Sequence, residues 1–381
     1  MTVVIIRRRF LLSLAVLVTA SSLAAQPTLE PISDAALLSG SPLHIPLNGL
    51  DPAGGALTFA AESSDPGLVA THIPEGNRSL RLAIAAMGDM VLELFEARAP
   101  RATNRIVELT ESGFYDGVTF HRVIDGFVIQ GGDPLGDGTG GSALGTWDDQ
   151  FHVDLQHNRS GVLSTAKTLD DTNDSQFFIT ESPTRGLDFN YTIFGQLVIG
   201  EDVREAISNV PTDAGDRPLT SIVIERAEII EDTQNGVLML KAPEAASGTV
   251  LITVTATDAG GVTAQQTFTV NVTPDTEDSA PFLADIPTLS TKVDTEFTYQ
   301  LKAIDVEGDS SLFLDEETMD LNGLPVPARA PADLTYRVES DTGVLRVTPL
   351  NGLTGTHFLS VATGVVVSAV DYQIVTVQID P

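Results

Sequence analysis

The middle of the chain contains the stretch Phe120-His121-Arg122-Val123-Ile124-Asp125-Gly126-Phe127-Val128-Ile129-Gln130-Gly131-Gly132-Asp133. It lies in a region, about residues 78 to 231, where Gly-rich loops separate apolar strands. Two helical patterns accompany it. Pro100–Glu111 starts with a proline, which suits a first helical turn, and its apolar residues recur on one side. Gly200–Ser208 opens with two acids, and negative charge is favourable at the positive, N-terminal end of a helix dipole.

Two further blocks follow in order, Gly161-Val162-Leu163-Ser164-Thr165-Ala166 and Asn173-Asp174-Ser175-Gln176-Phe177-Phe178-Ile179-Thr180. Downstream come Leu187-Asp188-Phe189 and Ile193-Phe194-Gly195. Together with residues 120–133, these blocks closely resemble cyclophilin-type peptidyl-prolyl cis-trans isomerases of a bacterial, exported kind. The resemblance runs from about residue 79 to 231. It implies a closed eight-stranded antiparallel barrel with two capping helices.

The reaction of such an isomerase requires few chemical groups. Rotation about a peptide bond meets a barrier of about 18–20 kcal/mol, because the nitrogen lone pair is shared with the carbonyl. An enzyme has to hold the proline ring, exclude water and place positive charge near the twisting amide. An apolar cup and one buried guanidinium suffice. We therefore expect no cofactor and no metal.

The resemblance assigns residues to these roles. It implies that Arg122 is the guanidinium, whose planar fork can bond both the substrate carbonyl and the prolyl nitrogen. It places Phe127 and Gln130 with Arg122 as catalytic residues, with Gln130 also bonding the substrate backbone. The substrate-binding residues that it implies are Val128, Ala166, Lys167, Gln176, Phe178, Leu187 and Tyr191.

Several positions depart from the family pattern. Val128 stands where Met is usual, which widens the predicted pocket. Lys167 stands where Asn is common, which removes an acceptor and adds a charge near the substrate path. Gly186 and Tyr191 replace a frequent Trp and a frequent His. We expect activity with an altered sequence preference.

Length and charge restrict the function classes. The chain has 381 residues, a net charge of −31 and no cysteine. Such an acidic chain repels nucleic-acid backbones and anionic membrane surfaces, so neither is an expected partner. The missing cysteines exclude a disulfide scaffold, a thiolate metal site and a Cys nucleophile. Hydrophobic residues make up 42% of the chain, enough for packed cores.

The N-terminus has the pattern of a secretory signal peptide. Arg7, Arg8 and Arg9 precede the apolar run 10–18 and the small-residue stretch 20–25. The apolar run is short for a membrane span. We predict cleavage near Ala25 or Gln26, an exported mature protein (periplasmic, surface-located or secreted) and no membrane span within it.

The regions flanking the predicted barrel alternate apolar and polar residues, as β-strands do, and residues 296–304 are predicted to form one such strand. They resemble immunoglobulin-like or cadherin-like surface modules. A sandwich of this type needs about 100 residues, so the two shorter flanks are predicted to complete each other around an inserted barrel. The predicted organisation is residues 1–25 signal peptide, 26–77 first half-sandwich, 78–231 isomerase domain, 232–275 second half-sandwich and 280–381 C-terminal sandwich.

Other motifs receive simpler interpretations. We interpret His121 as a packed structural residue and His152 and His157 as loop residues rather than metal ligands. Gly136–Gly141 fits G-x-G-x-x-G without a strand–helix context, and is predicted to be a flexible loop. Of the adjacent Phe177 and Phe178, one is core and the other lines the pocket. The acids Asp305, Glu307 and Asp309 form a solvated turn or, alternatively, help bind calcium.

Two functions remain open at this point. The first is an isomerase that assists the folding of exported proteins by acting on proline-containing polypeptides. The second is a surface adhesion or scaffold protein whose barrel binds proline segments with little turnover and whose sandwiches contact cell-surface proteins. A hydrolase has little support, because no Ser-His-Asp arrangement is evident.

Overall fold

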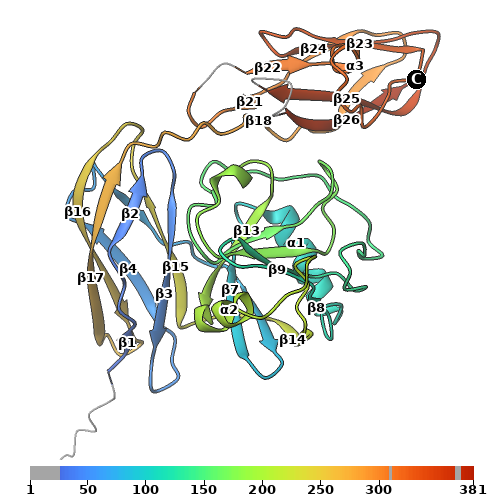
Figure 1. The fold of residues 1–381 in the computed structure, drawn as a ribbon. Coiled ribbons are helices and arrows are strands. Elements are labelled where there is room, and N and C mark those ends of the chain that lie inside the picture. The colour runs from blue at the N-terminus through green and yellow to red at the C-terminus, as the bar shows by residue number, and fades with distance from the viewer. Residues whose placement is uncertain (1–25, 309–310, 365–369) are drawn as a thin grey trace, which may run out of the picture.

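The structure is a computed structural model that describes residues 26–308, 311–364 and 370–381 (Figure 1). The predicted signal peptide lies outside the described residues. Within the described part of the chain, no helix is long and apolar enough to cross a membrane. Strands dominate, which confirms the predicted mainly-β class: a barrel-like sheet with helices is accompanied by further β-sheets.

Strands from both sides of the barrel form one sandwich. Its two four-stranded sheets have the orders β1-β3-β15-β5 and β2-β17-β16-β4. Five of these strands precede the barrel in sequence and three follow it. They are β1 (Thr28–Leu29), β2 (Ala35–Leu38), β3 (Leu43–Leu50), β4 (Thr58–Ser63), β5 (Ala70–His72), β15 (Asn235–Lys241), β16 (Gly248–Thr257) and β17 (Thr263–Thr273).

The pairing between the two halves is extensive. Strand β15 runs antiparallel to β3, with Leu238 opposite Ile45, and β17 runs parallel to β2, with Val270 opposite Ala35. Alternate residues of these strands point inward, because side chains on a strand alternate between faces. Side chains from both halves, Leu47 among them, share one buried core. Neither half therefore has a core of its own.

The central sheet contains nine strands in the order β8-β14-β6-β7-β13-β11-β12-β10-β9. Its two end strands are consecutive in the chain and are separated only by His121, so the sheet curls round into a near-closed barrel. The strands are β6 (Ser79–Ile84), β7 (Gly88–Leu94), β8 (Thr119–Phe120), β9 (Arg122–Ile124), β10 (Val128–Gly131), β11 (Val162–Thr165), β12 (Phe177–Thr180), β13 (Ile193–Ile199) and β14 (Ile222–Ile230).

Two helices pack against this barrel. Helix α1 (Pro100–Glu111) has the predicted bounds and buries Ala102, Ile106 and Leu109 in the barrel core. Helix α2 (Glu201–Ser208) begins one residue later than predicted, because Gly200 adopts a left-handed conformation with φ of 91° and serves as its N-cap. Figure 1 shows both helices beside the barrel.

The C-terminal region forms a second β-structure with its own core, in which Leu345, Val361 and Val375 are fully buried. Its sheets have the orders β19-β26-β25-β22, β20-β24-β23 and β18-β21. The elements are β18 (Phe282–Leu283), β19 (Leu289–Lys292), β20 (Phe297–Gln300), β21 (Ala303–Ile304), β22 (Leu312–Leu314), α3 (Glu316–Leu321), β23 (Leu334–Val338), β24 (Val344–Pro349), β25 (Gly355–Gly364) and β26 (Val370–Asp380).

One strand prediction in this region is wrong. Residues 296–304 read as a single strand, but the structure divides them into β20 and β21, which pair in different sheets. The chain crosses between the sheets at Leu301, whose side chain is buried in the core. The alternation of apolar and polar residues continues through both strands, so it does not reveal where the chain passes from one sheet to the other.

Candidate active site

Four residues form a row across one face of four neighbouring strands. Gln130 of β10 lies opposite Arg122 of β9 and, on its other side, opposite Phe178 of β12. Phe178 in turn lies opposite Ser164 of β11. Because directly opposed residues of antiparallel strands project from the same face, the register alone brings these side chains together. Adjacent Phe177 projects the other way and is fully buried in the barrel core.

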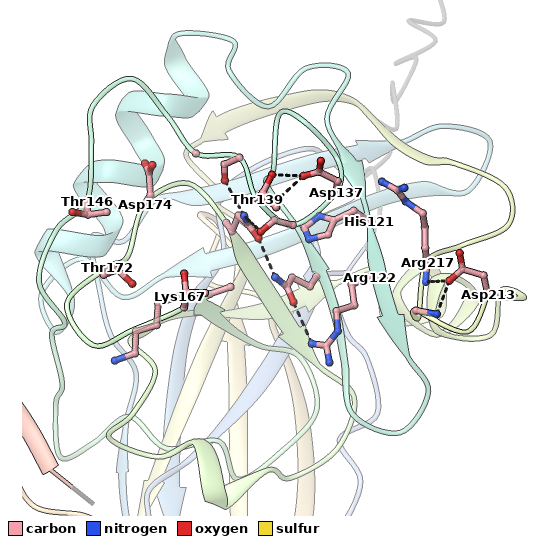
Figure 2. A pocket seen from close by; sticks show the side chains of 18 residues that line it. His121, Arg122, Asp137, Thr139, Thr146, Lys167, Thr172, Asp174, Asp213 and Arg217 are labelled. Atoms are coloured by element: carbon pink, nitrogen blue, oxygen red, sulfur yellow. Dashed lines mark hydrogen bonds between the residues drawn. The ribbon is translucent and has the colours of Figure 1, made fainter. Parts of the chain in front are cut away.

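Hydrogen bonds connect the polar members of this site (Figure 2). An Arg122 Nη1–Gln130 Oε1 contact of 3.4 Å is followed by a Gln130 Nε2–Gln176 Oε1 bond of 3.0 Å. Gln176 Nε2 donates to the carbonyls of Gly138 and Gly140 at 3.1 and 2.8 Å. Gln130 thus orients the guanidinium and is itself oriented by Gln176.

The guanidinium is half-exposed rather than buried as expected. The side chain of Arg122 is 41% exposed, and its Nε lies 3.6 Å from Oδ2 of Asp216. The reason is its place on the short edge strand β9, where the barrel wall ends. A bound polypeptide can therefore reach the guanidinium, and water would leave it only when such a ligand covers it.

An apolar wall lies beside this row. Val128 and Phe178 are almost completely buried. The ring of Phe178 stacks on His157 with centroids 5.9 Å apart and meets Tyr191 edge-on at 5.6 Å. Leu187 ends the short 3-10 helix η1 (Arg185–Leu187), and the Tyr191 amide donates to its carbonyl. Phe127, in the turn before β10, is half-buried.

A cavity of about 1020 Å³ opens next to the row. Five of the predicted site residues line it, and these are Arg122, Gln130, Ala166, Lys167 and Gln176. Phe127, Val128, Phe178, Leu187 and Tyr191 are not among its lining residues. Its remaining lining includes residues that the sequence did not single out, namely Asp137, Thr146, Asp174, Asp213 and Arg217 (Figure 2).

The glycine-rich loop at the cavity is anchored, contrary to the prediction of a flexible loop. The carboxylate of Asp133 accepts the amides of Leu135 and Asp137 at 2.8 and 2.9 Å. Burial would raise the pKa of Asp133, but these backbone donors outweigh it and lower the pKa. The glycines allow a tight path in which the carbonyls of Gly138 and Gly140 point at Gln176.

Lys167 does not place its charge on the substrate path as predicted. Its side chain is 4% exposed, and its ammonium contacts Asp149 and Asp170, the latter at 2.6 Å. Burial would lower the pKa of Lys167, yet the two carboxylates outweigh this and raise it. Asp149, Asp170 and Asp171 have carboxylate oxygens within 4.8 Å of one another, a spacing that could suit a metal ion, but Lys167 already neutralises two of them.

A Ser-His-Asp arrangement, which the sequence did not reveal, lies behind Phe178. His157 Nδ1 is 3.0 Å from Asp188 Oδ1, and His157 Nε2 is 2.7 Å from Ser164 Oγ. His157 lies in a loop, as predicted, but its side chain is completely buried. Because the three residues lie inside packed protein and Ser164 is fully buried, no substrate reaches them. Their geometry fixes the ring on which Phe178 stacks.

The other histidines and acids that the sequence singled out lie in structural rather than catalytic surroundings. His121 is buried, and burial lowers its pKa; its ring nitrogens have no hydrogen-bond partner among the described residues. His152 Nδ1 accepts the amide of Asp154. Asp305 accepts the amides of Glu307 and Gly308 in a turn, while Asp309 lies outside the described residues.

Comparison with known proteins identifies the family. The family described as "Cyclophilin type peptidyl-prolyl cis-trans isomerase/CLD" matches residues 79–229. A peptidyl-prolyl cis-trans isomerase of Schizosaccharomyces pombe is 44% identical over 144 residues, which cover 37% of this chain and 93% of that protein. The chain belongs to the cyclophilin-type peptidyl-prolyl cis-trans isomerase family.

Other relatives of this cyclophilin match the same region. A peptidyl-prolyl cis-trans isomerase of Arabidopsis thaliana is 38% identical over 160 residues, covering 42% of this chain and 98% of the relative. A cyclophilin-type isomerase structure from Cryptosporidium parvum is 37% identical, covers 41% of this chain and 99% of its own, and gives a TM-score of 0.40. These matches cover the region of the barrel.

Proposed function

We propose that this cyclophilin catalyses rotation about Xaa-Pro bonds in exported polypeptides through the row of Arg122, Gln130 and Phe178. The observation that supports this proposal is the strand register, which sets a guanidinium and an amide that line the cavity beside an apolar ring. A cation beside an apolar surface suits a proline ring and the amide that precedes it.

The proposed mechanism uses these groups without a covalent step. The proline ring packs against Phe178 and Val128, while Gln130 bonds the substrate backbone. The guanidinium of Arg122 approaches the prolyl nitrogen and draws its lone pair away from the carbonyl, which weakens the partial double bond. Because this interaction strengthens as the nitrogen becomes pyramidal, it stabilises the transition state more than the ground state.

The setting of the reaction is part of the proposal. We infer that residues 1–25 direct export, that the mature chain starts near Ala25 or Gln26, and that the flanking regions are immunoglobulin-like modules. The shared core of strands 28–72 and 235–273 supports one sandwich interrupted by the barrel. Mass spectrometry of the mature N-terminus tests the export step, and an intact residue 1 in the folded protein would refute cleavage.

The isomerase proposal is tested by exchange NMR or a protease-coupled assay on an Xaa-Pro peptide. We expect Arg122→Ala to lower kcat/KM by about 100-fold or more, a loss typical of removing one transition-state donor. Arg226→Ala is the matched control, because Arg226 is 66% exposed on β14, away from the site. Near-background rates from both wild type and Arg122→Ala would refute the enzyme, and peptide binding without turnover would then favour the scaffold function.

A further inference from the structure

The segment that joins the two sandwiches holds one wall of the isomerase site through an ion pair. Arg185, at the start of η1, places Nη1 at 2.8 Å from Oδ2 of Asp275, and its Nε contacts Asp188. The side chains of Arg185 and Asp275 are 9% and 12% exposed, so solvent screens this pair little. Because η1 ends at Leu187, the linker fixes the turn that carries a predicted proline-pocket residue.

An aromatic contact fixes the same wall from the C-terminal sandwich. Phe282 of β18 stacks on Phe189 with centroids 5.0 Å apart and an interplanar angle of 21°, and it meets Phe151 at 5.6 Å. Phe189 and Phe282 are both nearly completely buried. Phe189 lies only two residues after Leu187, so this stacking and the Arg185 ion pair hold one short segment, 185–189, from two directions.

A third contact reaches a segment that lines the cavity. The backbone amide of Tyr372 on β26 donates to Oδ2 of Asp170 at 3.1 Å. Asp170 also binds the ammonium of Lys167, and both lie in the segment 166–172, of which Ala166, Lys167, Thr168 and Thr172 line the cavity.

The held segment is connected to the row of site residues. Asp188 binds both Arg185 and the buried ring of His157, and that ring stacks on Phe178. Contacts made by Asp275 therefore continue through Arg185, Asp188 and His157 to the pocket ring. Because each of these contacts is packed and buried, the position of one residue constrains the position of the next.

We propose that the linker and the C-terminal sandwich act as an internal support for the substrate site, with Asp275 and Phe282 as positioning residues. The proposal rests on the isomerase function proposed above. Neither residue lines the cavity, so each acts by ordering segment 185–189 before substrate arrives, while the Tyr372 amide holds segment 166–172. A preformed wall lowers the ordering entropy that binding has to overcome, and its loss appears mainly in KM.

The test uses the full mature chain and two pairs of matched variants. Asp275→Ala is compared with Asp278→Ala, the same change three residues along in the exposed part of the linker. Phe282→Ala is compared with Phe358→Ala, since Phe358 is 50% exposed on β25. We expect both test variants to raise KM about fivefold or more, a typical coupling between distant groups, with kcat within about twofold. Both controls should match wild type.

A second measurement does not depend on activity. Hydrogen exchange followed by mass spectrometry should show faster exchange in segment 185–189 of Asp275→Ala and Phe282→Ala, but not of the controls. Unchanged KM and unchanged exchange in Asp275→Ala would overturn the support role, and if Phe282→Ala unfolds the sandwich, Asp275→Ala decides alone. An inactive wild type with the expected exchange pattern would refute the isomerase function while leaving the support in place.

Discussion

At the scale of single residues, Lys167 shows how burial changes the role of a charge. Its ammonium is enclosed with the carboxylates of Asp149 and Asp170, and the side chain of Asp149 is only 2% exposed. Removing one member of a buried ion pair is costly, because the partner charge remains in a poorly polarisable environment. Lys167 therefore contributes to the stability of the 166–172 segment rather than to a charge on the substrate path.

We predict that Lys167→Met lowers the free energy of unfolding by about 3–5 kcal/mol, the cost of leaving buried carboxylates unpaired. Lys241→Met is the control, because Lys241 is 47% exposed in its pair with Asp154 and should cost less than about 1 kcal/mol. Urea unfolding of both variants measures the difference. Equal losses from the two variants would contradict this role for Lys167.

The sequence indicated that Arg122, Gln130 and Phe178 lie together, but not how their surroundings are held. The motifs around Arg122 and Phe178 lie on short neighbouring strands. The resemblance therefore led us to expect these side chains in one row. The partners of Lys167 and Arg185 could not be expected, because Asp149 and Asp275 lie 18 and 90 residues away. Such pairs depend on how loops and domains pack, which local patterns do not encode.

At the scale of elements, the junction between β13 and α2 depends on one glycine. Gly200 has φ of 91°, and a β-carbon placed there would lie 2.4 Å from the carbonyl oxygen of Asp89 on β7. Strand, turn and helix therefore approach closely only if this position lacks a side chain.

We predict that Gly200→Ala destabilises the protein by about 1–3 kcal/mol, through backbone strain at a left-handed position and displacement of β7. Gly186→Ala provides the comparison, since Gly186 lies in η1 at negative φ and a β-carbon there meets nothing within 4 Å. This variant should stay within about 0.5 kcal/mol of wild type. The midpoint of thermal unfolding distinguishes them, and an unaffected Gly200→Ala would refute the steric argument.

The helices were easier to predict than the strands of the C-terminal region. Helix α1 has both a proline at its start and an apolar face of helical period, and its bounds were predicted without error. Residues 296–304 offered only alternation, which two short strands in different sheets satisfy equally well. The period of the apolar residues identifies an element as a helix or a strand. The strand with which it pairs depends on residues far away in the sequence.

At the scale of the whole molecule, carboxyl groups crowd the contact between the barrel and the C-terminal sandwich. Asp371 on β26 is buried, and burial followed by the charges of Asp170, Asp171 and Asp149 raises its pKa. Burial also raises the pKa of Asp171 to about 8. The contact therefore favours protonated carboxyls.

This crowding predicts a pH dependence of stability. Between an ordinary carboxyl pKa of about 4 and the raised value of about 8 for Asp171, the folded state holds more protons than the unfolded chain. Stability should therefore fall as the pH rises through this range. Asp371→Asn, which needs no proton to be neutral, should make the fall shallower and raise the urea midpoint at pH 8.

Urea unfolding from pH 5 to pH 8 measures this effect. Asp341→Asn, on an exposed turn of the same sandwich, should leave the wild-type slope unchanged. A slope that is identical in wild type and Asp371→Asn would show that Asp371 stays ionised in the folded protein.

The interrupted sandwich has a mechanical consequence. Strands β2 and β17 lie side by side and parallel, and the described chain continues from the N-terminal end of one and from the C-terminal end of the other. Pulling the two ends apart therefore loads the β2–β17 pair in shear, and several hydrogen bonds between these strands are strained at the same time. While the sandwich stays closed, the backbone of the barrel between residues 72 and 235 lies outside the path of the force, which reaches the barrel only through side contacts such as Arg185–Asp275. A tethered chain under strain would therefore not stretch the backbone that carries the Arg122 row until the sandwich opened.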